Sequence, residues 1–300
     1  MLSLHTNAAS LSAQNSLTRT QTNLSTSMTR LSTGYRINSS MDDAAGLQIA
    51  TRLKAQSSGM SVAMRNTQNS ISLMQTADGA LNEVNNILTR MKDLATQAAD
   101  GSSSADDKTA MDSEYNSLTD ELSNIFSNTK FGGTKLLSTA SDGKLNSGTG
   151  LTFQIGADSS ETMTANFDTE LSGASGVTTK INAATSGFVS DGSSSTPSTG
   201  TVLSGSATSA NTAISNLSSA IDAVSTLRSK LGAVSNRLDH VYNNLSNISS
   251  NTQAATGRIM DVDFATESSS MTSNQMLMQA GTAMLKQTNS MSSMVMSLLQ

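Results

Sequence analysis

The feature that most constrains this chain is a seven-residue repeat of apolar side chains between residues 217 and 248. Its members form two neighbouring series: Leu217, Val224, Leu231, Leu238 and Leu245, and Leu227, Val234, Val241 and Ile248. An α-helix completes a turn in about 3.6 residues, so such a repeat places both series along one face. Sustained over this length, the repeat predicts a long helix packed nearly parallel to others in a bundle or coiled coil.

Four further stretches carry their larger side chains at alternating spacings of four and three residues, which is typical of helices that bury one face. They contain Leu17, Leu24, Met28, Leu31 and Tyr35; then Leu73, Ala77, Ala80, Val84, Ile87, Met91, Leu94 and Ala98; then Met111, Tyr115, Leu118, Leu122 and Ile125; and last Leu277, Gly281, Met284, Thr288, Met291, Val295 and Leu298. The last stretch is rich in Met, which tolerates irregular packing. We interpret it as a seam between helices and not as a metal or cofactor site.

The middle of the chain has a different pattern. Apolar and polar residues alternate in the runs 151–155 and 163–167, which predicts a β-hairpin with one apolar face. Gly, Ser and Thr dominate residues 173–209, which also contain the only proline, Pro197. That composition predicts a loop-rich or weakly ordered insertion on the surface.

Together these patterns predict a mainly α fold. It is a long antiparallel helical bundle or coiled coil with paired N- and C-termini, a small β-hairpin region and a short variable insertion. The expected domains are a terminal helical domain of residues 1–42 and 256–300, a helical bundle of residues 43–170 and 210–255 with the hairpin at about 130–168, and a Ser/Gly/Thr-rich insertion at 171–209.

A joint is expected between the first two helices. Gly34 and Asn38 suit a non-helical segment, so the first helix should stop near Thr33. Ser40 and Asp43 have the spacing of a capping box, in which a hydroxyl and an acidic side chain cap each other's main-chain N–H groups. The second helix should therefore begin near Asp42.

The two ends of the chain are nearly uncharged. Residues 1–40 carry charge only at Arg19, Arg30 and Arg36, and residues 268–300 only at Lys286. A helix exposed to water usually has a charged face, so these ends suit burial among copies of themselves. The expected self-assembly residues are Leu17, Leu24, Leu31, Leu277, Met284, Met291, Val295 and Leu298.

Composition excludes several classes of function. Leu, Ile, Val and Phe make up 56 of 300 residues, so the chain buries little apolar surface alone and partners would supply the rest. With no Cys, disulfides, thiolate metal sites and cysteine catalysis are excluded. The net charge of −5 argues against a nucleic-acid partner. No apolar run approaches the roughly 20 residues that cross a bilayer, and residues 1–15 do not form a cleaved secretory signal.

Catalytic and metal-binding constellations are not found either. His5 and His240 are the only histidines, and they belong to no zinc-binding pattern. Asp261 and Asp263 are too few ligands for a divalent cation, and no glycine-rich phosphate loop follows a predicted strand. We expect no enzyme activity, no cofactor, no metal site, and no nucleic-acid or membrane partner.

Short motifs at both ends of the chain resemble the bacterial flagellin family. They are Leu31–Ser39, Asp42–Leu47, Thr76–Leu81, Phe131–Leu137, Arg258–Ala265, Gln279–Gly281 and Ser297–Leu299. Each is modest alone, but in this order at both ends they are specific. The resemblance covers roughly residues 1–140 and 213–300. Two departures from the commoner pattern, the residues of Met1–Asn7 and the Met-rich final turn, look like flagellins of the lateral or swarming type.

The resemblance implies a structural subunit that polymerises into the flagellar filament for motility. It also implies export in an unfolded state by the flagellar type III system, to the outside of the cell. The implied partners are further copies of the chain, a flagellar export chaperone, the hook–filament junction and cap proteins, and the host Toll-like receptor for flagellin.

For the receptor, the resemblance implies contacts by Arg90, Leu94 and Glu114. Arg90 and Glu114 lie off the apolar stripes and should face outward. Leu94 lies on a stripe, so its first role is expected to be in the core.

Two other interpretations remain open at this point. A hook–filament junction protein shares the design of the ends, and the motifs at Thr76–Leu81 and Arg258–Ala265 favour a flagellin over it. A soluble coiled-coil adaptor or secretion-system translocator would also have long helices, but it would not need both terminal motifs.

Overall fold

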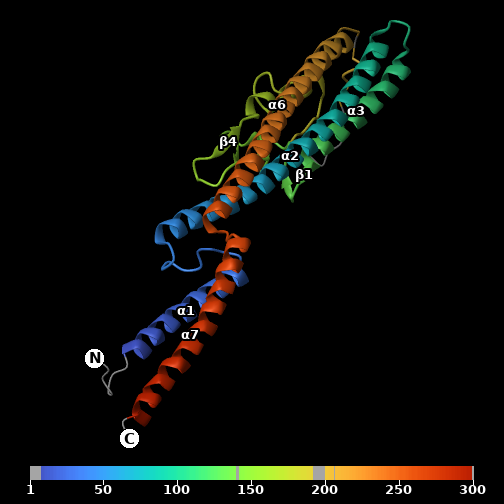
Figure 1. Ribbon diagram of the computed structural model, residues 1–300. Coiled ribbons are helices and arrows are strands. Elements are labelled where there is room, and N and C mark those ends of the chain that lie inside the picture. Colours follow the sequence, from blue (N-terminus) through green and yellow to red (C-terminus); the bar gives the residue numbers. More distant parts are fainter. Residues whose placement is uncertain (1–7, 140–141, 192–199, 206, 299–300) are drawn as a thin grey trace. The chain divides into compact units, whose positions relative to one another are not determined.

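A computed structural model describes residues 8–139, 142–191, 200–205 and 207–298, with the side chains of residues 207 and 291–300 left out. Helices dominate it (Figure 1). In chain order the elements are α1 (Ala8–Thr33), α2 (Ala44–Ala99), α3 (Ala105–Asn128), β1 (Lys130–Phe131), β2 (Thr134–Lys135), the 3₁₀ turn η1 (Lys144–Asn146), β3 (Leu151–Gln154), β4 (Thr162–Ala165), α4 (Asp168–Leu171), α5 (Val177–Ala184), α6 (Ala207–Met260) and α7 (Phe264–Leu298). The mainly α fold predicted from the heptads is confirmed.

The chain divides into two units, each with its own contacts. The terminal unit consists of residues 1–57 and 249–300, and the central unit of residues 58–248. The terminal unit therefore contains α1, α7, the start of α2 and the end of α6. The central unit contains the rest of α2 and α6 together with α3, the strands and the short helices.

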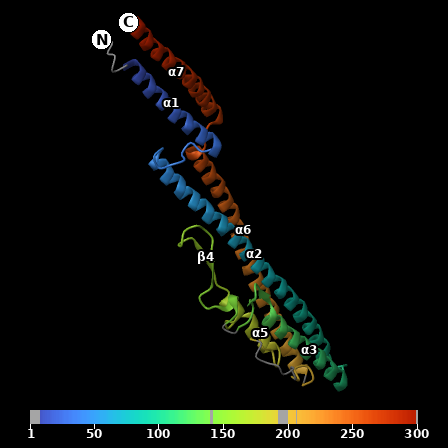
Figure 2. The same ribbon diagram turned by 90° about the horizontal axis from the view of Figure 1, so that it is seen from below.

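In the terminal unit α1 and α7 lie side by side and antiparallel (Figures 1 and 2). The Ser10 hydroxyl lies 3.5 Å from the Asn289 side-chain oxygen, and Arg30 Nη1 lies 3.7 Å from Glu267 Oε2. Residue numbers that rise along α1 thus fall along α7, which confirms the predicted pairing of the two ends of the chain.

The joint between α1 and α2 pairs with the segment that enters α7. Tyr35 forms an antiparallel bridge with Asp261. The main-chain N–H of Arg36 donates to the Met260 carbonyl at 2.6 Å, and that of Val262 donates to the Gly34 carbonyl at 3.0 Å. Gly34 has a φ of 74°, a conformation that costs glycine little, and α1 ends directly before it at Thr33, as predicted.

Acidic side chains cap the helices at this joint. Asp43 Oδ1 accepts from the main-chain N–H of Gly46 at 2.8 Å, so Asp43 itself caps α2. The predicted capping box with Ser40 is wrong, because Asp43 occupies the capping position and not the third helical position. Asp263 caps α7 in the same way, and the main-chain N–H of Thr266, 3.2 Å from its Oδ1, does most to lower the pKa of that carboxyl.

In the central unit α2, α3 and α6 bury the predicted stripes against one another. Leu217, Val224, Leu231 and Leu238 are all completely buried. Ile248, the last residue of the second heptad series on α6, is instead 39% exposed. At that level α6 packs mainly on α2, in a small cluster built on Met60, Ala63 and Leu245, and one partner helix can cover only one stripe.

The predicted β-hairpin is present and covers one side of the bundle. β3 and β4 are antiparallel, with Leu151 opposite Ala165 and Phe153 opposite Met163. Phe153 and Met163 are buried, as the alternation predicted.

The Ser/Gly/Thr-rich segment contributes to the core, contrary to the exposed insertion that its composition predicted. Val177, Ile181 and Leu203 are completely buried, and the Phe188 ring meets the Phe126 ring edge to face, 5.4 Å between centroids. A few apolar residues, spaced irregularly, are enough to attach this segment to α3. Pro197 lies outside the described residues.

Polar side chains of α3 hold the same segment in place. The Asp112 carboxylate is buried and accepts from the main-chain N–H groups of Leu203 and Ser204, each at 2.8 Å. The Tyr115 hydroxyl donates to the Ala184 carbonyl at 2.7 Å. Burial, and to a smaller extent the charge of Asp112, raises the pKa of Tyr115, so this hydroxyl remains a donor at all physiological pH values.

We predict that Asp112→Ala lowers the free energy of unfolding of the central unit by about 1–3 kcal/mol, because two buried N–H donors lose their acceptor. Urea unfolding followed by circular dichroism measures this change. The matched control is Glu121→Ala, an exposed acid on the same helix, with an expected change within about 0.5 kcal/mol. Equal stability of the two variants would show that the Asp112 contacts contribute nothing.

Candidate functional site

The stripe of α1 that was predicted for self-assembly faces α7 within the subunit. Leu17, Leu24 and Leu31 are all half-buried, at the spacing that one helix face requires. Gly281 of α7 lies against Leu17, since a Cβ added to this glycine would come within 3.0 Å of Leu17 Cδ1. The glycine therefore lets the two helices approach closely, and these leucines hold the pair together.

On α7 the predicted stripe divides between two faces. Gly281 and Thr288 are half-buried and face α1, whereas Leu277 is 56% and Met284 63% exposed. After Glu267, the described residues that are half-buried along α7 are Met271, Asn274, Met278, Gly281, Leu285 and Thr288. Their spacing also alternates between three and four, but the polar Asn274 made this series harder to recognise in the sequence than the one through Leu277.

We call the uncovered side of α7, defined by Met276, Leu277 and Met284, its outer apolar face. Met276 is 60% exposed, similar to the other two. At about 100° per residue the three lie within roughly 100° of one another on the helix. Met291, Val295 and Leu298 were also predicted for assembly, and their side chains lie outside the described residues.

α1 adds to the uncovered apolar surface of the terminal unit. Leu11 is 62% and Met28 51% exposed. Monomeric soluble proteins rarely leave extended apolar patches open to water unless the patch binds something.

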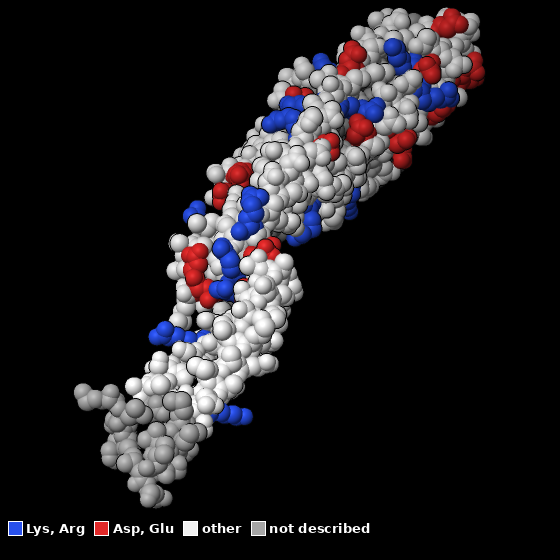
Figure 3. All heavy atoms as spheres, in the orientation of Figure 1, with Lys and Arg blue, Asp and Glu red and all other residues white. Residues whose placement is uncertain are grey.

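Few charged side chains are visible on the described parts of α1 and α7 on the side seen in Figure 3, where these helices are mostly white. Within the described part of the terminal unit, Arg30 and Glu267 form the one ion pair, at 3.7 Å, with both side chains largely buried at the α1–α7 contact. A charged pair at this place fixes the register of the two helices, because a shift by one turn would leave both charges without a partner.

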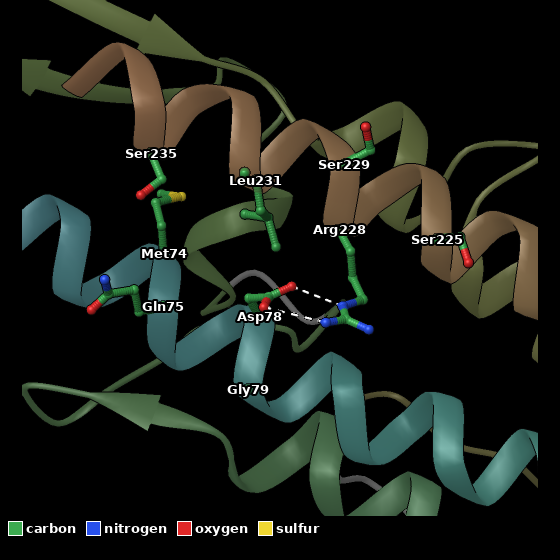
Figure 4. Close-up of a pocket in the computed structure, with 10 residues that line it drawn as sticks. Met74, Gln75, Asp78, Gly79, Ser225, Arg228, Ser229, Leu231 and Ser235 are labelled. Carbon is green, nitrogen blue, oxygen red and sulfur yellow. Dashed lines mark hydrogen bonds and ion pairs between the residues drawn. The ribbon is translucent and has the colours of Figure 1, made fainter. Parts of the chain in front are cut away.

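The central unit has a groove of about 580 Å³ between α2 and α6 (Figure 4). The guanidinium of Arg228 crosses it and binds Asp78, with Nε 2.8 Å from Oδ1. The hydrogen bond that Arg228 donates to the Asp78 carboxylate raises the pKa of Arg228, so the two charges stay paired. The remaining wall consists mainly of small Ser and Gly residues, which supply neither an acid–base pair nor an activated nucleophile.

The three residues predicted to contact the host receptor have different environments. Arg90 binds Glu114 through two bonds, from Nε at 2.9 Å and from Nη2 at 2.7 Å. Both side chains are about half exposed, at 55% and 45%. Leu94 is 2% exposed and belongs to the core. The ion pair between α2 and α3 was not foreseen from the sequence, because it depends on how the two helices align.

Neither a metal centre nor a membrane span is found in the described part of the chain. Its acidic and histidine side chains form no group of three that would hold a metal ion. None of its helices combines the length and the apolarity that a bilayer crossing requires.

Comparison with known proteins agrees with this arrangement. The N-terminal helical region of bacterial flagellin matches residues 4–142, and the C-terminal helical region matches residues 214–299. Flagellin A of Vibrio anguillarum is 35% identical, and polar flagellin C of Vibrio parahaemolyticus is 34% identical; both alignments cover all of this chain and all of the relative.

A solved structure with the same fold comes from a protein described as flagellar hook-associated, from Vibrio parahaemolyticus. It is 19% identical, has a TM-score of 0.56, and aligns over 73% of this chain and 100% of its own. At that identity the likeness concerns the fold alone. The full-length relatives and both matched regions show that the chain belongs to the bacterial flagellin family, the structural, non-enzymatic subunits that form the extracellular flagellar filament for motility.

Proposed function

We propose that this flagellin polymerises through the outer apolar face of α7, together with the exposed apolar residues of α1. The single observation that carries the proposal is the exposure of Met276, Leu277 and Met284, each more than half uncovered in the subunit. The occupant of this face is a second copy of the chain, because the family forms a homopolymer and this is the least charged part of the molecule.

The assembly residues then have two separate roles. Leu17, Leu24 and Leu31 shape the subunit by holding α1 against α7. Leu277 and Met284 contact the neighbouring copy, and we extend this role to Met291, Val295 and Leu298 from their spacing in the sequence.

Burial of the outer apolar face supplies the driving force. Moving a Leu or Met side chain completely out of water contributes about 1.5–3 kcal/mol. The exposed parts of Met276, Leu277 and Met284 would add on the order of 3–5 kcal/mol per subunit. Each subunit in a filament has several neighbours, so modest contacts accumulate.

We predict that Leu277→Asp prevents polymerisation, because assembly would bury an unpaired carboxylate. Light scattering and electron microscopy of seeded protein measure this. The control is Gln275→Asp, which puts the same charge on the opposite side of α7 and should leave the critical concentration within about threefold of wild type. Circular dichroism should show both variants folded, and normal filaments from Leu277→Asp would refute the assignment of this face.

The same face requires protection before export. We infer that a dedicated flagellar chaperone covers it while the chain waits for the type III system, since an uncovered apolar helix would polymerise early. After export, the hook–filament junction and cap proteins would bind subunits through the same terminal unit.

We predict that a chain lacking residues 260–300 no longer forms a complex with the chaperone, measured by calorimetry or co-purification. The variant Arg36→Ala is the comparison: it removes the bond from the Arg36 guanidinium to the Ile259 carbonyl, 2.9 Å, but leaves α7 present. It should bind with unchanged affinity. Undiminished binding by the truncated chain would place the chaperone site elsewhere.

We also propose that Arg90 and Glu114 form the contact with the host Toll-like receptor for flagellin. Support comes from their match to the family pattern and from their mutual ion pair on the surface. Glu114 holds the guanidinium in one orientation, so less side-chain freedom is lost on binding. Leu94 is buried, so its proposed role is to support the helix beneath Arg90.

We predict that Arg90→Ala lowers the potency of the subunit toward receptor-reporter cells by about tenfold or more, the loss typical of a central interface arginine. Arg237→Ala, which removes an exposed arginine on α6, should keep wild-type potency. If Arg90→Ala were as potent as wild type, Arg90 would not be part of the contact. Intact filaments should be poor agonists, because neighbouring subunits would cover this surface.

A further inference from the structure

The methionines of this flagellin fall into two classes. Most of those in the central unit are buried: Met60, Met74, Met91, Met111 and Met163. Among the described side chains of the terminal unit, in contrast, four methionines are more than half exposed: Met28, Met41, Met276 and Met284. Because the chain has no Cys, exposed thioethers are its most reactive groups toward two-electron oxidants.

Two of these thioethers lie at the centre of the proposed assembly surface. Met276 is 60% and Met284 63% exposed, and both lie beside Leu277 on the outer apolar face of α7. They are separated by eight residues, or about two turns of the helix. The half-buried Met271 and Met278 face α1 instead.

We propose that Met276 and Met284 form a reversible oxidation site that prevents assembly when it is oxidised. The inference rests on the proposed function of the outer apolar face. The oxidants are peroxides and hypohalous acids, which reach the sulfurs in the free subunit. A filament would shield the same sulfurs between copies, so the site acts on subunits before they are incorporated.

The reaction with hydrogen peroxide is a simple oxygen transfer. A lone pair of the thioether sulfur attacks one peroxide oxygen, the O–O bond breaks, and proton transfer to the departing oxygen gives water. The sulfur is oxidised to a sulfoxide and the peroxide is reduced. A methionine sulfoxide reductase reverses the change by reducing the sulfoxide at the expense of thiols.

The chemical consequence follows from the change in polarity. A thioether is a weak acceptor that packs well in an apolar contact, whereas a sulfoxide is strongly polar. Burying it without a hydrogen-bond donor is unfavourable. Leu277, which lies beside both methionines on this face, offers no hydrogen-bond donor to either sulfoxide.

The test uses the complete chain and hydrogen peroxide. Free subunits are oxidised until peptide mass spectrometry shows sulfoxide at both Met276 and Met284 with Met74 and Met163 unchanged. Seeded polymerisation then gives the critical concentration before and after treatment. We expect the treated wild type to need at least about tenfold more protein, and treatment with both sulfoxide reductases to restore the original value.

Two variants locate the effect. For each variant, the critical concentration after peroxide treatment is divided by the value before treatment. An effect of the substitutions on assembly of the untreated protein therefore cancels. Met276→Leu with Met284→Leu is made together with Met291→Leu, because Met291 is also assigned to the contact with the neighbouring copy. This chain should have nearly the same critical concentration before and after treatment. Met28→Leu with Met41→Leu removes the other two methionines that are more than half exposed among the described side chains, and it should remain as sensitive as wild type.

The outcomes separate this inference from the proposed function. If doubly oxidised wild type assembled at its untreated concentration while Leu277→Asp was blocked, the oxidation site alone would be refuted. It would also be refuted if the chain with Leu at positions 276, 284 and 291 lost assembly on treatment as the wild type does. Normal filaments from Leu277→Asp would instead overturn the assembly face and the oxidation site together.

Discussion

A helix with apolar side chains on two faces cannot cover both with one partner, and this constraint governs the terminal unit. α1 covers the side of α7 that contains Met278 and Gly281, and the side that contains Leu277 and Met284 remains exposed. Few charges are present to keep such a surface in water. The two helices of this unit pack on each other but leave apolar side chains exposed to water. A polymerising subunit requires such a surface, because contact with a neighbouring copy then removes it from water.

The central unit satisfies the same physical requirements within one chain. Three long helices bury their stripes against one another, and the hairpin and short helices cover the remaining side. Two polar groups of α3 that this layer buries, Asp112 and Tyr115, have hydrogen-bond partners inside the unit. Lys230 also has its partners inside this unit: it binds Glu170 at 2.7 Å and lies over the Phe167 ring. This unit can therefore keep its shape whether or not neighbours are present.

Local and periodic features were predictable from the sequence, and contacts that depend on alignment were not. The heptads predicted α6, and alternation predicted β3 and β4, since each pattern reports directly on which side of an element is buried. The stripe on α7 was predicted as one seam through Leu277 and Met284, because the competing series includes the polar Asn274, which is not expected to face a helix. The burial of Phe188 and Leu203 was missed for a related reason. Composition describes the average of a segment, whereas a few buried apolar residues are enough to pack that segment against the core.

The joint around Gly34 has a mechanical consequence for a protein whose assembly serves motility. If one strand alone connected α1 to α2, rotation about a few single bonds would let the helices swivel freely. Here the Tyr35–Asp261 bridge and the main-chain hydrogen bonds beside it join the segment that follows α1 to the segment that precedes α7. Two strands bonded in this way bend together about a common axis and resist twisting around each other. The joint therefore behaves as a hinge and not as a swivel, so a turning load applied to α1 is shared at once with α7.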